Sequence, residues 1–460
     1  MPSALPLKAD IDGCGDPFKH ISLSDIRLDA GTCHRLPFNE PTRGLPNVLG
    51  AMLVSRAFRG LGKIKSGRKD MKRLNIGGIA AGCALWVMMG MLGTPANAWL
   101  RGHVQQLTVL PDAAPGVQSS VEGLTVGPDG NIYVPTFGFN TTGSTTGPAT
   151  LFVISPAGGK VVRQVTLKAS PPASPHMLGL AFNPVTGRLL ILDFGSGLAT
   201  GTANVLDVDP NTGNASVFAT VPTVAGSGTV PAINALTFDR SGNVYVSDSF
   251  QGIIWTAPDS CHGCQMTPWS NFPALLGPGT GLTPPFGANG IEFSNDYSTM
   301  YVADTAFHQI IQIPVTSSGG NLIPGTPSIL ITGINAPDGI AVDRQGNIWV
   351  CSNQEDEIVV IDPKATNPIT GKPLPKVIAK LGDFYGIGQN GIAQGFLFPA
   401  SLAFSKDGKM LYVSNLTLYL PYAGAEAAID SNWTLQVKGY TVSQIPALIP
   451  PLNGNDNSQQ

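Results

Sequence analysis

The sequence predicts an all-β fold, a six-bladed β-propeller with four-stranded blades around a central channel. One unit recurs six times: a small residue followed by Leu or Ile opens a strand, and a turn and a second strand follow. The residue just before the small residue is called the register residue, because it is the position on which the six copies are aligned. The copies are spaced 49 to 62 residues apart, and repeats of roughly 40–50 residues are typical of propellers. The six register residues are Glu122, Leu178, Asn234, Asn289, Asp338 and Ala400.

The fourth copy shows the strands of one blade most clearly. Ile291 and Phe293 alternate with polar residues, and a turn with Asn295 and Asp296 separates them from the next apolar stretch. A β-branched third stretch follows, and an outermost strand is best seen in this copy. The strands predicted in this blade are 291–293, 300–303, 310–313 and 327–332.

Two strand-like stretches lie outside the six copies, at residues 103–110 and 434–442. Propellers commonly close their ring by pairing a strand from one end of the chain into the blade made by the other end, because this protects both sheet edges. We expect these two stretches to close the ring in this way.

The propeller is predicted at residues 99–449, with further segments on either side. Residues 1–70 keep no strand or helix period and predict a poorly structured N-terminal extension. A start at Met71 would place this extension upstream of the working protein. Residues 450–460 are polar and predict a disordered tail.

Residues 71–98 have the features of a signal peptide. Lys72 and Arg73 precede an apolar stretch, and an A-x-A cleavage pattern ends at Ala98. A membrane anchor is the alternative, although the stretch is short and Gly-rich for a span. We therefore expect an exported protein, periplasmic or secreted, with no stable membrane span after cleavage.

The charge balance argues against nucleic acid as a partner. Charged residues make up 12% of the chain and the formal net charge is −3. After Ala98 the chain carries 14 basic and 23 acidic residues, and such a moderately acidic body suits a soluble exported protein. The expected partner is a small-molecule substrate, and the expected state is a monomer.

The register residues suggest a metal site, because innermost strands line the channel of a propeller and bring equivalent positions to one axis. Glu122, Asn234, Asn289 and Asp338 carry oxygen-bearing side chains. Two carboxylates and two carboxamides are hard donors that Ca²⁺ prefers, and Mg²⁺ or Mn²⁺ can also bind them. Without a cation the carboxylates would face each other in a partly desolvated channel. Alternatively, these residues simply cap or solvate the channel mouth.

The sequence around these four residues resembles the metal site of the gluconolactonase and senescence-marker-protein (SMP/gluconolactonase/LRE) family, and more distantly the paraoxonases. The resemblance covers about residues 103–445. It implies one divalent metal on the propeller axis and hydrolysis of lactones or other esters, with the metal polarising the carbonyl and lowering the pKa of bound water. Two copies depart from the family pattern, since Leu124 stands where Pro is usual and Ala235 follows Asn234.

His176 and Asp338 are the candidate catalytic residues. His176 precedes the second inner strand by two residues and can act as a general base, although a lone His near a loop is commonly a surface residue. Asp338 can combine metal binding with proton transfer. The expected cofactor is one divalent ion, Ca²⁺ first, with Mg²⁺, Mn²⁺ or Zn²⁺ as alternatives.

Aromatic residues follow the second strands, which return to the metal face. They predict an apolar wall around a polar centre, as in small-molecule pockets, and the alternative is packing between blades. The predicted pocket residues are Phe137, Phe194, Phe250 and Phe307. Asp193, Asp248 and Asp304 share one register at the ends of these strands and predict turn or capping roles.

Three cysteines of the propeller segment have predicted states. Cys261 and Cys264 lie between a third and a fourth strand, on the face away from the metal, and predict a local disulfide in an exported protein. Zinc is the alternative, but two sulfurs and His262 in so short a loop make a poor site. Cys351 follows a core strand and predicts a buried free thiol.

Three functions are compatible with these features. The first is a metal-dependent lactonase or esterase, which the four-ligand register favours. The second is a non-catalytic (NHL-like) binding propeller that presents a face to a protein or glycan. The third is a lyase or isomerase that uses the same metal to stabilise an enolate-like charge. Fold alone does not decide among them.

Overall fold

The computed structural model describes residues 103–141, 143–277, 286–419 and 431–447. All of these residues belong to one of the chain's two units, Met88–Gln460. The predicted extension at 1–70, the signal peptide at 71–98 and the tail at 450–460 lie outside the described residues. Within the described ranges, no helix is long and apolar enough to cross a membrane.

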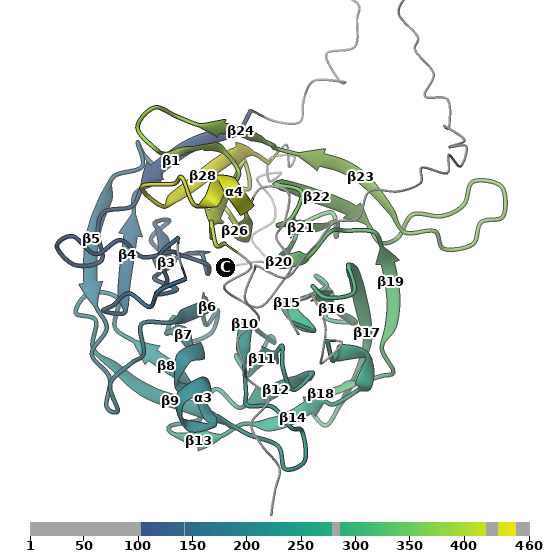
Figure 1. Cartoon of the computed structure of the whole chain (residues 1–460). Coiled ribbons are helices and arrows are strands. Elements are labelled where there is room, and N and C mark those ends of the chain that lie inside the picture. The colour runs from purple at the N-terminus through teal and green to yellow at the C-terminus, as the bar shows by residue number, and fades with distance from the viewer. Residues whose placement is uncertain (1–102, 142, 278–285, 420–430, 448–460) are drawn as a thin grey trace, which may run out of the picture. The chain divides into compact units, whose positions relative to one another are not determined.

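Six sheets surround a common centre (Figure 1), which confirms the predicted six-bladed propeller. The innermost strands are β2 (Thr125–Val126), β6 (Met177–Phe182), β10 (Ile233–Phe238), β15 (Ala288–Phe293), β20 (Pro337–Val342) and β26 (Pro399–Phe404). The second strands are β3 (Ile132–Pro135), β7 (Leu189–Asp193), β11 (Val244–Asp248), β16 (Thr299–Asp304), β21 (Ile348–Ser352) and β27 (Met410–Asn415).

The outer half of each blade is built from a third and a fourth strand. The third strands of blades one to five are β4 (Thr150–Ile154), β8 (Thr202–Val208), β12 (Ile253–Ala257), β17 (Gln309–Ser318) and β22 (Glu357–Asp362). The fourth are β5 (Val161–Thr166), β9 (Ala215–Pro222), β14 (Thr267–Ser270), β19 (Ser328–Thr332) and β23 (Lys376–Leu381). The outermost strand predicted at 327–332 is thereby confirmed as β19.

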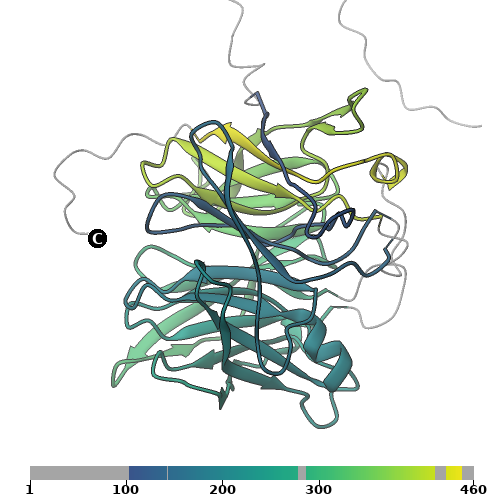
Figure 2. The same ribbon diagram turned by 90° about the vertical axis from the view of Figure 1, so that its left-hand side faces the viewer.

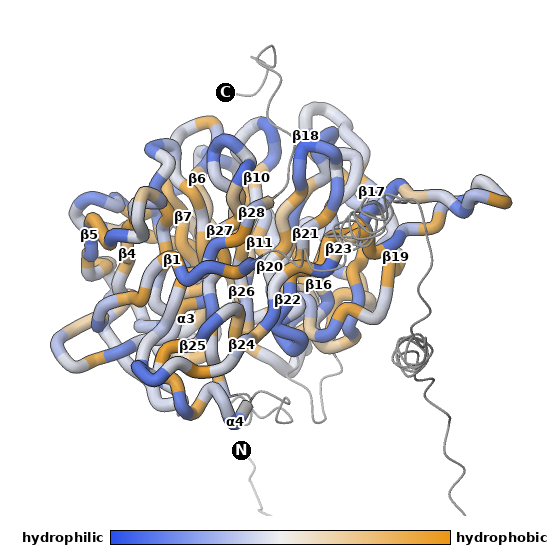
Figure 3. Tube along the Cα trace, turned by 90° about the horizontal axis from the view of Figure 1, so that it is seen from above, coloured by the Kyte–Doolittle hydropathy of each residue, from blue (hydrophilic) through white to orange (hydrophobic). Residues whose placement is uncertain are grey.

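Three shorter strands decorate the rim. β13 (Cys264–Gln265) leaves blade three and pairs in parallel with β9 of blade two. β18 (Asn321–Pro324) extends a hairpin from β17, and β24 (Phe384–Ile387) pairs with β25 (Ala393–Gly395). The loop between β22 and β23 stands out from the ring (Figure 3), and Ile369 in it is 93% exposed.

Both ends of the described chain build the sixth blade, as predicted. β1 (Gln105–Val109) pairs antiparallel with β28 (Thr441–Pro446), and β28 pairs with β27. The dark-blue β1 lies beside the yellow β28 in Figures 1 and 2. The strand predicted at 434–442 was wrong in its bounds. The chain turns after the short helix α4 (Ser431–Thr434), and β28 begins only at Thr441, which pairs with β1, while pairing with β27 starts at Val442.

The hydrophobic core is divided into layers between neighbouring blades. In β7, Leu189 and Ile191 pack toward blade one, whereas Leu190 and Leu192 pack toward blade three. Alternation sends successive side chains to opposite faces of a strand, so both faces of this blade are buried. Each fully buried Leu or Ile contributes on the order of 1.5–3 kcal/mol, and the ring is held together by these layers.

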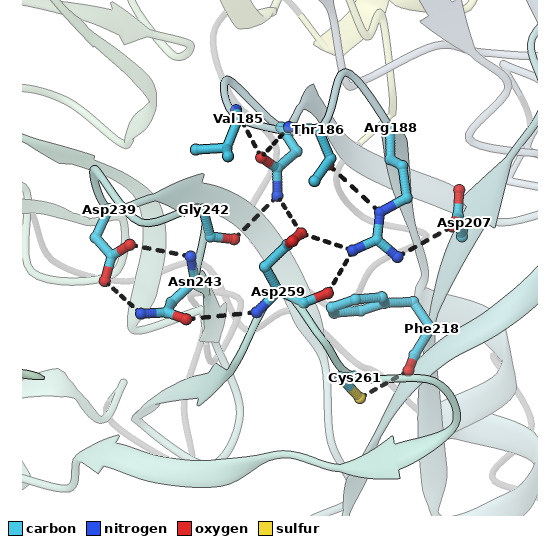
Figure 4. A network of polar contacts seen from close by, with 11 residues as sticks. Val185, Thr186, Arg188, Asp207, Phe218, Asp239, Gly242, Asn243, Asp259 and Cys261 are labelled. Atoms are coloured by element: carbon cyan, nitrogen blue, oxygen red, sulfur yellow. Dashed lines mark hydrogen bonds and ion pairs between the residues drawn. The ribbon is translucent and has the colours of Figure 1, made fainter.

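Blades two and three are also joined by a polar network on the face away from the register residues (Figure 4). Asn183 donates a hydrogen bond of 2.9 Å to the carboxylate of Asp259. The guanidinium of Arg188 lies 2.6 Å from the same carboxylate and 3.5 Å from that of Asp207. Asp259 follows β12 and Arg188 precedes β7, so the contacts cross the boundary between the blades.

The predicted cysteine states are confirmed. Cys261 and Cys264 form a disulfide between β12 and β14. Cys264 opens β13, so the disulfide lies next to the strand that pairs with blade two. Cys351 is a fully buried free thiol in β21.

One segment expected as a loop is a helix. Residues after β7 form α3 (Phe194–Thr200). Asp193 caps its N-terminus by accepting a hydrogen bond from the Ser196 amide, and Gly201 ends it in the left-handed conformation at φ 71°. A carboxylate N-cap and a C-terminal glycine are strong helix boundaries.

Glycine in the inner strands lets neighbouring blades approach each other closely. A Cβ on Gly123 would lie 2.2 Å from the carbonyl oxygen of Leu178, and one on Gly179 would lie 2.6 Å from that of Asn234. The same relation holds for Gly290 with Asp338 and for Gly339 with Ala400, at 2.2 and 2.6 Å. In these four blades, the glycine after the register residue therefore faces the register residue of the next blade.

We expect Gly179→Ala to destabilise the propeller by about 1–3 kcal/mol, the usual range for overpacking. The new methyl would meet backbone atoms of Asn234 and Ala235, which cannot rotate away. Because Asn234 is itself a candidate metal ligand, parent and variant are compared in the presence of a chelator. The measurement is urea denaturation.

Ala235→Gly is the matched control, because it makes the reverse change at the equivalent position of blade three. Its cost should stay below about 1 kcal/mol, the entropic penalty of glycine. A Gly179→Ala variant as stable as the parent would contradict the close approach.

Candidate functional site

The four polar register residues lie buried at the centre of the ring. Their exposed fractions are between 4% and 6%, and they come from blades one, three, four and five. The four are Glu122, Asn234, Asn289 and Asp338. Leu178 and Ala400, the register residues of the other two blades, are also buried. Asn234, Asn289 and Asp338 lie in the inner strands β10, β15 and β20, and Glu122 lies shortly before β2.

The carboxyl groups of Glu122 and Asp338 oppose each other electrostatically. Burial raises the pKa of Glu122 well above its ordinary value, and the charge of Asp338 raises it further. Burial also raises the pKa of Asp338 to about 7, against the amides of Asn353 and Asn289, which lower it. Among the described side chains, neither carboxylate has an ion-pair partner. Buried charges of one sign are relieved by protonation or by a bound cation.

Asn289 is oriented by Thr305. The amide nitrogen of Asn289 donates a 2.9 Å hydrogen bond to the Thr305 hydroxyl, which in turn donates 2.7 Å to the carbonyl of Pro337. Because the amide nitrogen of Asn289 points to Thr305, its oxygen points away from Thr305. That oxygen is buried and has no hydrogen-bond partner within the described structure.

Asp338 is held in a similar way by Asn353. The Asn353 amide donates a 3.1 Å hydrogen bond to Oδ2 of Asp338, and Gln354 donates 3.3 Å to the Asn353 oxygen. Oδ1 of Asp338 is buried and, within the described structure, has no hydrogen-bond partner. Buried oxygens without partners are rare in native proteins, so these two could accept from, or coordinate, a further group.

The donor set fits a divalent cation. It combines two carboxylates with two carboxamides, all hard oxygen donors, and two of its oxygens are unsatisfied. Across the residues that the structure describes, no group of three or more His, Cys, Asp and Glu side chains is arranged to hold a metal ion. A cation held at this centre would therefore need Asn234 and Asn289 besides the two carboxylates.

Three of the four predicted pocket aromatics gather in one apolar cluster. Phe137 and Phe194 are 8% and 6% exposed, and the half-buried Phe250 packs against them. The ring centroids of Phe194 and Phe250 lie 6.5 Å apart. Phe307 is 49% exposed and does not join this cluster.

His176 is fixed beside this cluster rather than free on the surface. Its Nδ1 lies 2.8 Å from the carbonyl oxygen of Phe137, and its ring stacks on Phe139 with centroids 4.1 Å apart. A carbonyl only accepts, so Nδ1 carries the proton and Nε2 keeps its lone pair. Burial lowers the pKa of His176, which keeps the ring neutral near pH 7.

The three aspartates at the ends of second strands have the predicted capping roles. Asp193 caps α3. Asp248 accepts hydrogen bonds from the amides of Ala232 and Gln251 and from the indole of Trp255. Asp304 accepts from the side chain of Gln309 at 2.7 Å. The recurrence of Asp at this register is therefore structural.

Thr305 and Asn353 are site residues that sequence reasoning missed. Each directly follows the last residue of a second strand, and Ser249 occupies the same position in blade three. Ser249 donates 2.7 Å to the carbonyl of Ala288, as Thr305 does to that of Pro337. A signal was present, since three successive blades carry a polar residue at this one register.

Comparison with known proteins confirms the resemblance seen in the sequence. Residues 284–379 match the family described as SMP-30/Gluconolactonase/LRE-like region, and this range contains Asn289 and Asp338. The chain is 24% identical over 202 residues to lactonase drp35 of Staphylococcus saprophyticus. That match covers 42% of this chain and 53% of the relative, so the chain spans about half the length of that curated protein.

The solved structure of a luciferin-regenerating enzyme shares the propeller fold. It aligns with a TM-score of 0.50 at 16% identity, covering 75% of this chain and 96% of that one. A gluconolactonase from Xanthomonas campestris aligns with a TM-score of 0.45 at 15% identity, covering 75% of this chain and 94% of that one.

We expect Thr305→Val to lower the free energy of unfolding by about 1–3 kcal/mol, the cost of leaving buried polar groups unpaired. The change keeps the shape of the side chain but removes both hydrogen bonds, to Asn289 and to Pro337. Thr305→Ser keeps the hydroxyl and should lose less. The measurement is urea denaturation in the presence of a chelator. Equal stability of the Val and Ser variants would show that the hydroxyl does not hold Asn289.

We expect the free energy of unfolding of Asp304→Asn to fall less than that of the parent as the pH rises from about 4 to 7. Burial raises the pKa of Asp304 to about 6, whereas an unfolded Asp titrates at about 3.9. Between these pH values the folded chain binds more protons than the unfolded chain, so the parent loses stability as the pH rises. From about pH 4 to 7 the variant should gain on the order of 2 kcal/mol relative to the parent. Parallel urea denaturation curves at both pH values would detect this, and an unchanged difference would refute it.

Proposed function

We propose that this protein is a metal-dependent hydrolase of a lactone or related ester. The single observation that carries the proposal is the buried ring of four oxygen-bearing side chains, in which two oxygens have no hydrogen-bond partner within the described structure. The family match over residues 284–379 and the similarity to a lactonase support the same chemistry.

Glu122, Asn234, Asn289 and Asp338 are the residues that would hold the cation. Thr305 and Asn353 keep two of these side chains oriented through hydrogen bonds of 2.9 and 3.1 Å. A divalent cation supplies Lewis-acid polarisation of an ester carbonyl and lowers the pKa of a neighbouring water. Such outer hydrogen bonds matter because losing one commonly weakens metal affinity or activity 10–100-fold.

His176 is the proposed general base. Its Nε2 lone pair is available because Nδ1 donates to the Phe137 carbonyl. His176 removes a proton as water attacks the carbonyl carbon, and returns it to the ring oxygen when the carbon–oxygen bond of the lactone breaks. The product is a hydroxy acid. Asp338 is the second residue in this group that can hold a proton.

The test begins with elemental analysis of the protein beside an Asn289→Ala, Asp338→Ala double variant. We expect about one equivalent of divalent metal in the parent, with Ca²⁺ first, and none in the variant. Lactone hydrolysis should fall with it by about two orders of magnitude or more.

The matched control is an Asp239→Ala, Asn243→Ala double variant. It also removes one Asp and one Asn from a hydrogen-bonded site, but on the far face of blade three. It should lose stability and keep the metal. A metal-free parent whose Tm does not respond to Ca²⁺, Mg²⁺, Mn²⁺ or Zn²⁺ would overturn the hydrolase and favour a binding propeller.

A further inference from the structure

The residues one position after the last residue that pairs a second strand with its inner strand form another ring on the metal face, around the register residues. In blade one that last paired residue is Thr136, which bridges to Val121 just beyond β3. From blade one to blade six they are Phe137, Phe194, Ser249, Thr305, Asn353 and Leu416. The polar members occupy three neighbouring blades, three to five, and the apolar members occupy the other three. The ring is thus divided into a polar half and an apolar half.

The register residues inside this ring follow nearly the same division. Asn234, Asn289 and Asp338 belong to blades three to five, whereas Leu178 and Ala400 belong to blades two and six. Glu122 in blade one is the exception. Leu178 and Ala400 pack in the same cluster as the apolar members of the outer ring. In blades two and six, the apolar half therefore extends inward as far as the propeller axis.

The side chains of the polar half use their hydrogen bonds to hold the inner strands that carry Asn289 and Asp338. Ser249 and Thr305 donate to the carbonyls that precede Asn289 and Asp338, and Asn353 donates to Asp338 itself. These groups therefore offer a substrate few free hydrogen bonds beyond the reacting centre. The reacting carbonyl belongs beside this half, where the unsatisfied oxygens lie.

The apolar half is bordered by side chains that are only partly covered. Phe250 and Leu418 are half-buried and pack at its edges in blades three and six. Phe250 continues to Phe286, with ring centroids 5.2 Å apart. Apolar side chains left partly uncovered beside a polar centre are the usual lining of a small-molecule site.

We infer that the substrate is a lactone or ester carrying an alkyl or aryl substituent, which lies over blades six, one and two. This inference rests on the proposed hydrolase function and specifies its substrate class. The carbonyl end lies at the polar half, and the substituent covers the Phe137 and Phe194 side. A polyhydroxylated sugar lactone is a poor fit, because its hydroxyls would be buried against phenylalanine without partners.

The test is a series of γ-lactones with alkyl chains from none to five carbons, with glucono-1,5-lactone alongside. Burial of one methylene is worth roughly a three- to fourfold gain in affinity, so kcat/KM should rise by about that factor per carbon until the apolar half is covered. Phe250→Ser and Leu418→Ser should each flatten this slope. Ile329→Ser, on the outer strand β19 and 58% exposed, is the control and should leave it unchanged.

Matching γ-alkyl lactams, which resist hydrolysis, separate recognition from chemistry. Their effect on Tm should increase with chain length in the parent and in Ile329→Ser, and less so in Phe250→Ser. Lactone hydrolysis with a flat or falling slope, or with gluconolactone preferred, would overturn the substrate class and leave the hydrolase standing. If the lactams raise Tm more as their alkyl chain grows, but no lactone is hydrolysed, the hydrolase proposal is overturned and the apolar recognition stands.

Discussion

The close approach of neighbouring inner strands at the axis is the constraint on which the rest of the molecule depends. Gly179 and Gly290 lie where a side chain would collide with the backbone of the next blade. Because the strands meet so tightly, their register residues enter one small region that excludes water. The same geometry that closes the ring therefore determines which side chains face one another at its centre.

That region carries an electrostatic cost which the blades cannot relieve by themselves. Burial raises the pKa of both Glu122 and Asp338, and the charge of Asp338 raises that of Glu122 further. The surrounding hydrogen bonds orient these side chains but bring no positive charge. A bound proton or a bound cation would relieve this cost.

Much of this arrangement was predictable because the repeat fixes the register. Once Asn234 and Asn289 are aligned, the propeller geometry brings them to one axis, and the alternation of apolar residues gives the strands. Thr305 and Asn353 were not predicted, since their role depends on side-chain hydrogen bonds between strands that sequence spacing does not reveal. The helix after Asp193 was missed because a single capping aspartate looks the same in a turn and at a helix start.

The sixth blade is assembled from strands at opposite ends of the propeller, and it stands between Asp338 of blade five and Glu122 of blade one. Gln105 pairs with Gln444 across 339 residues of sequence. Closing so long a loop has a large entropic cost, so we expect this pairing to form late in folding. During synthesis on the ribosome, the two carboxylates gain their final separation only after β28 has emerged. A nascent chain thus stays without the complete group of buried axial side chains until almost the whole propeller has been made.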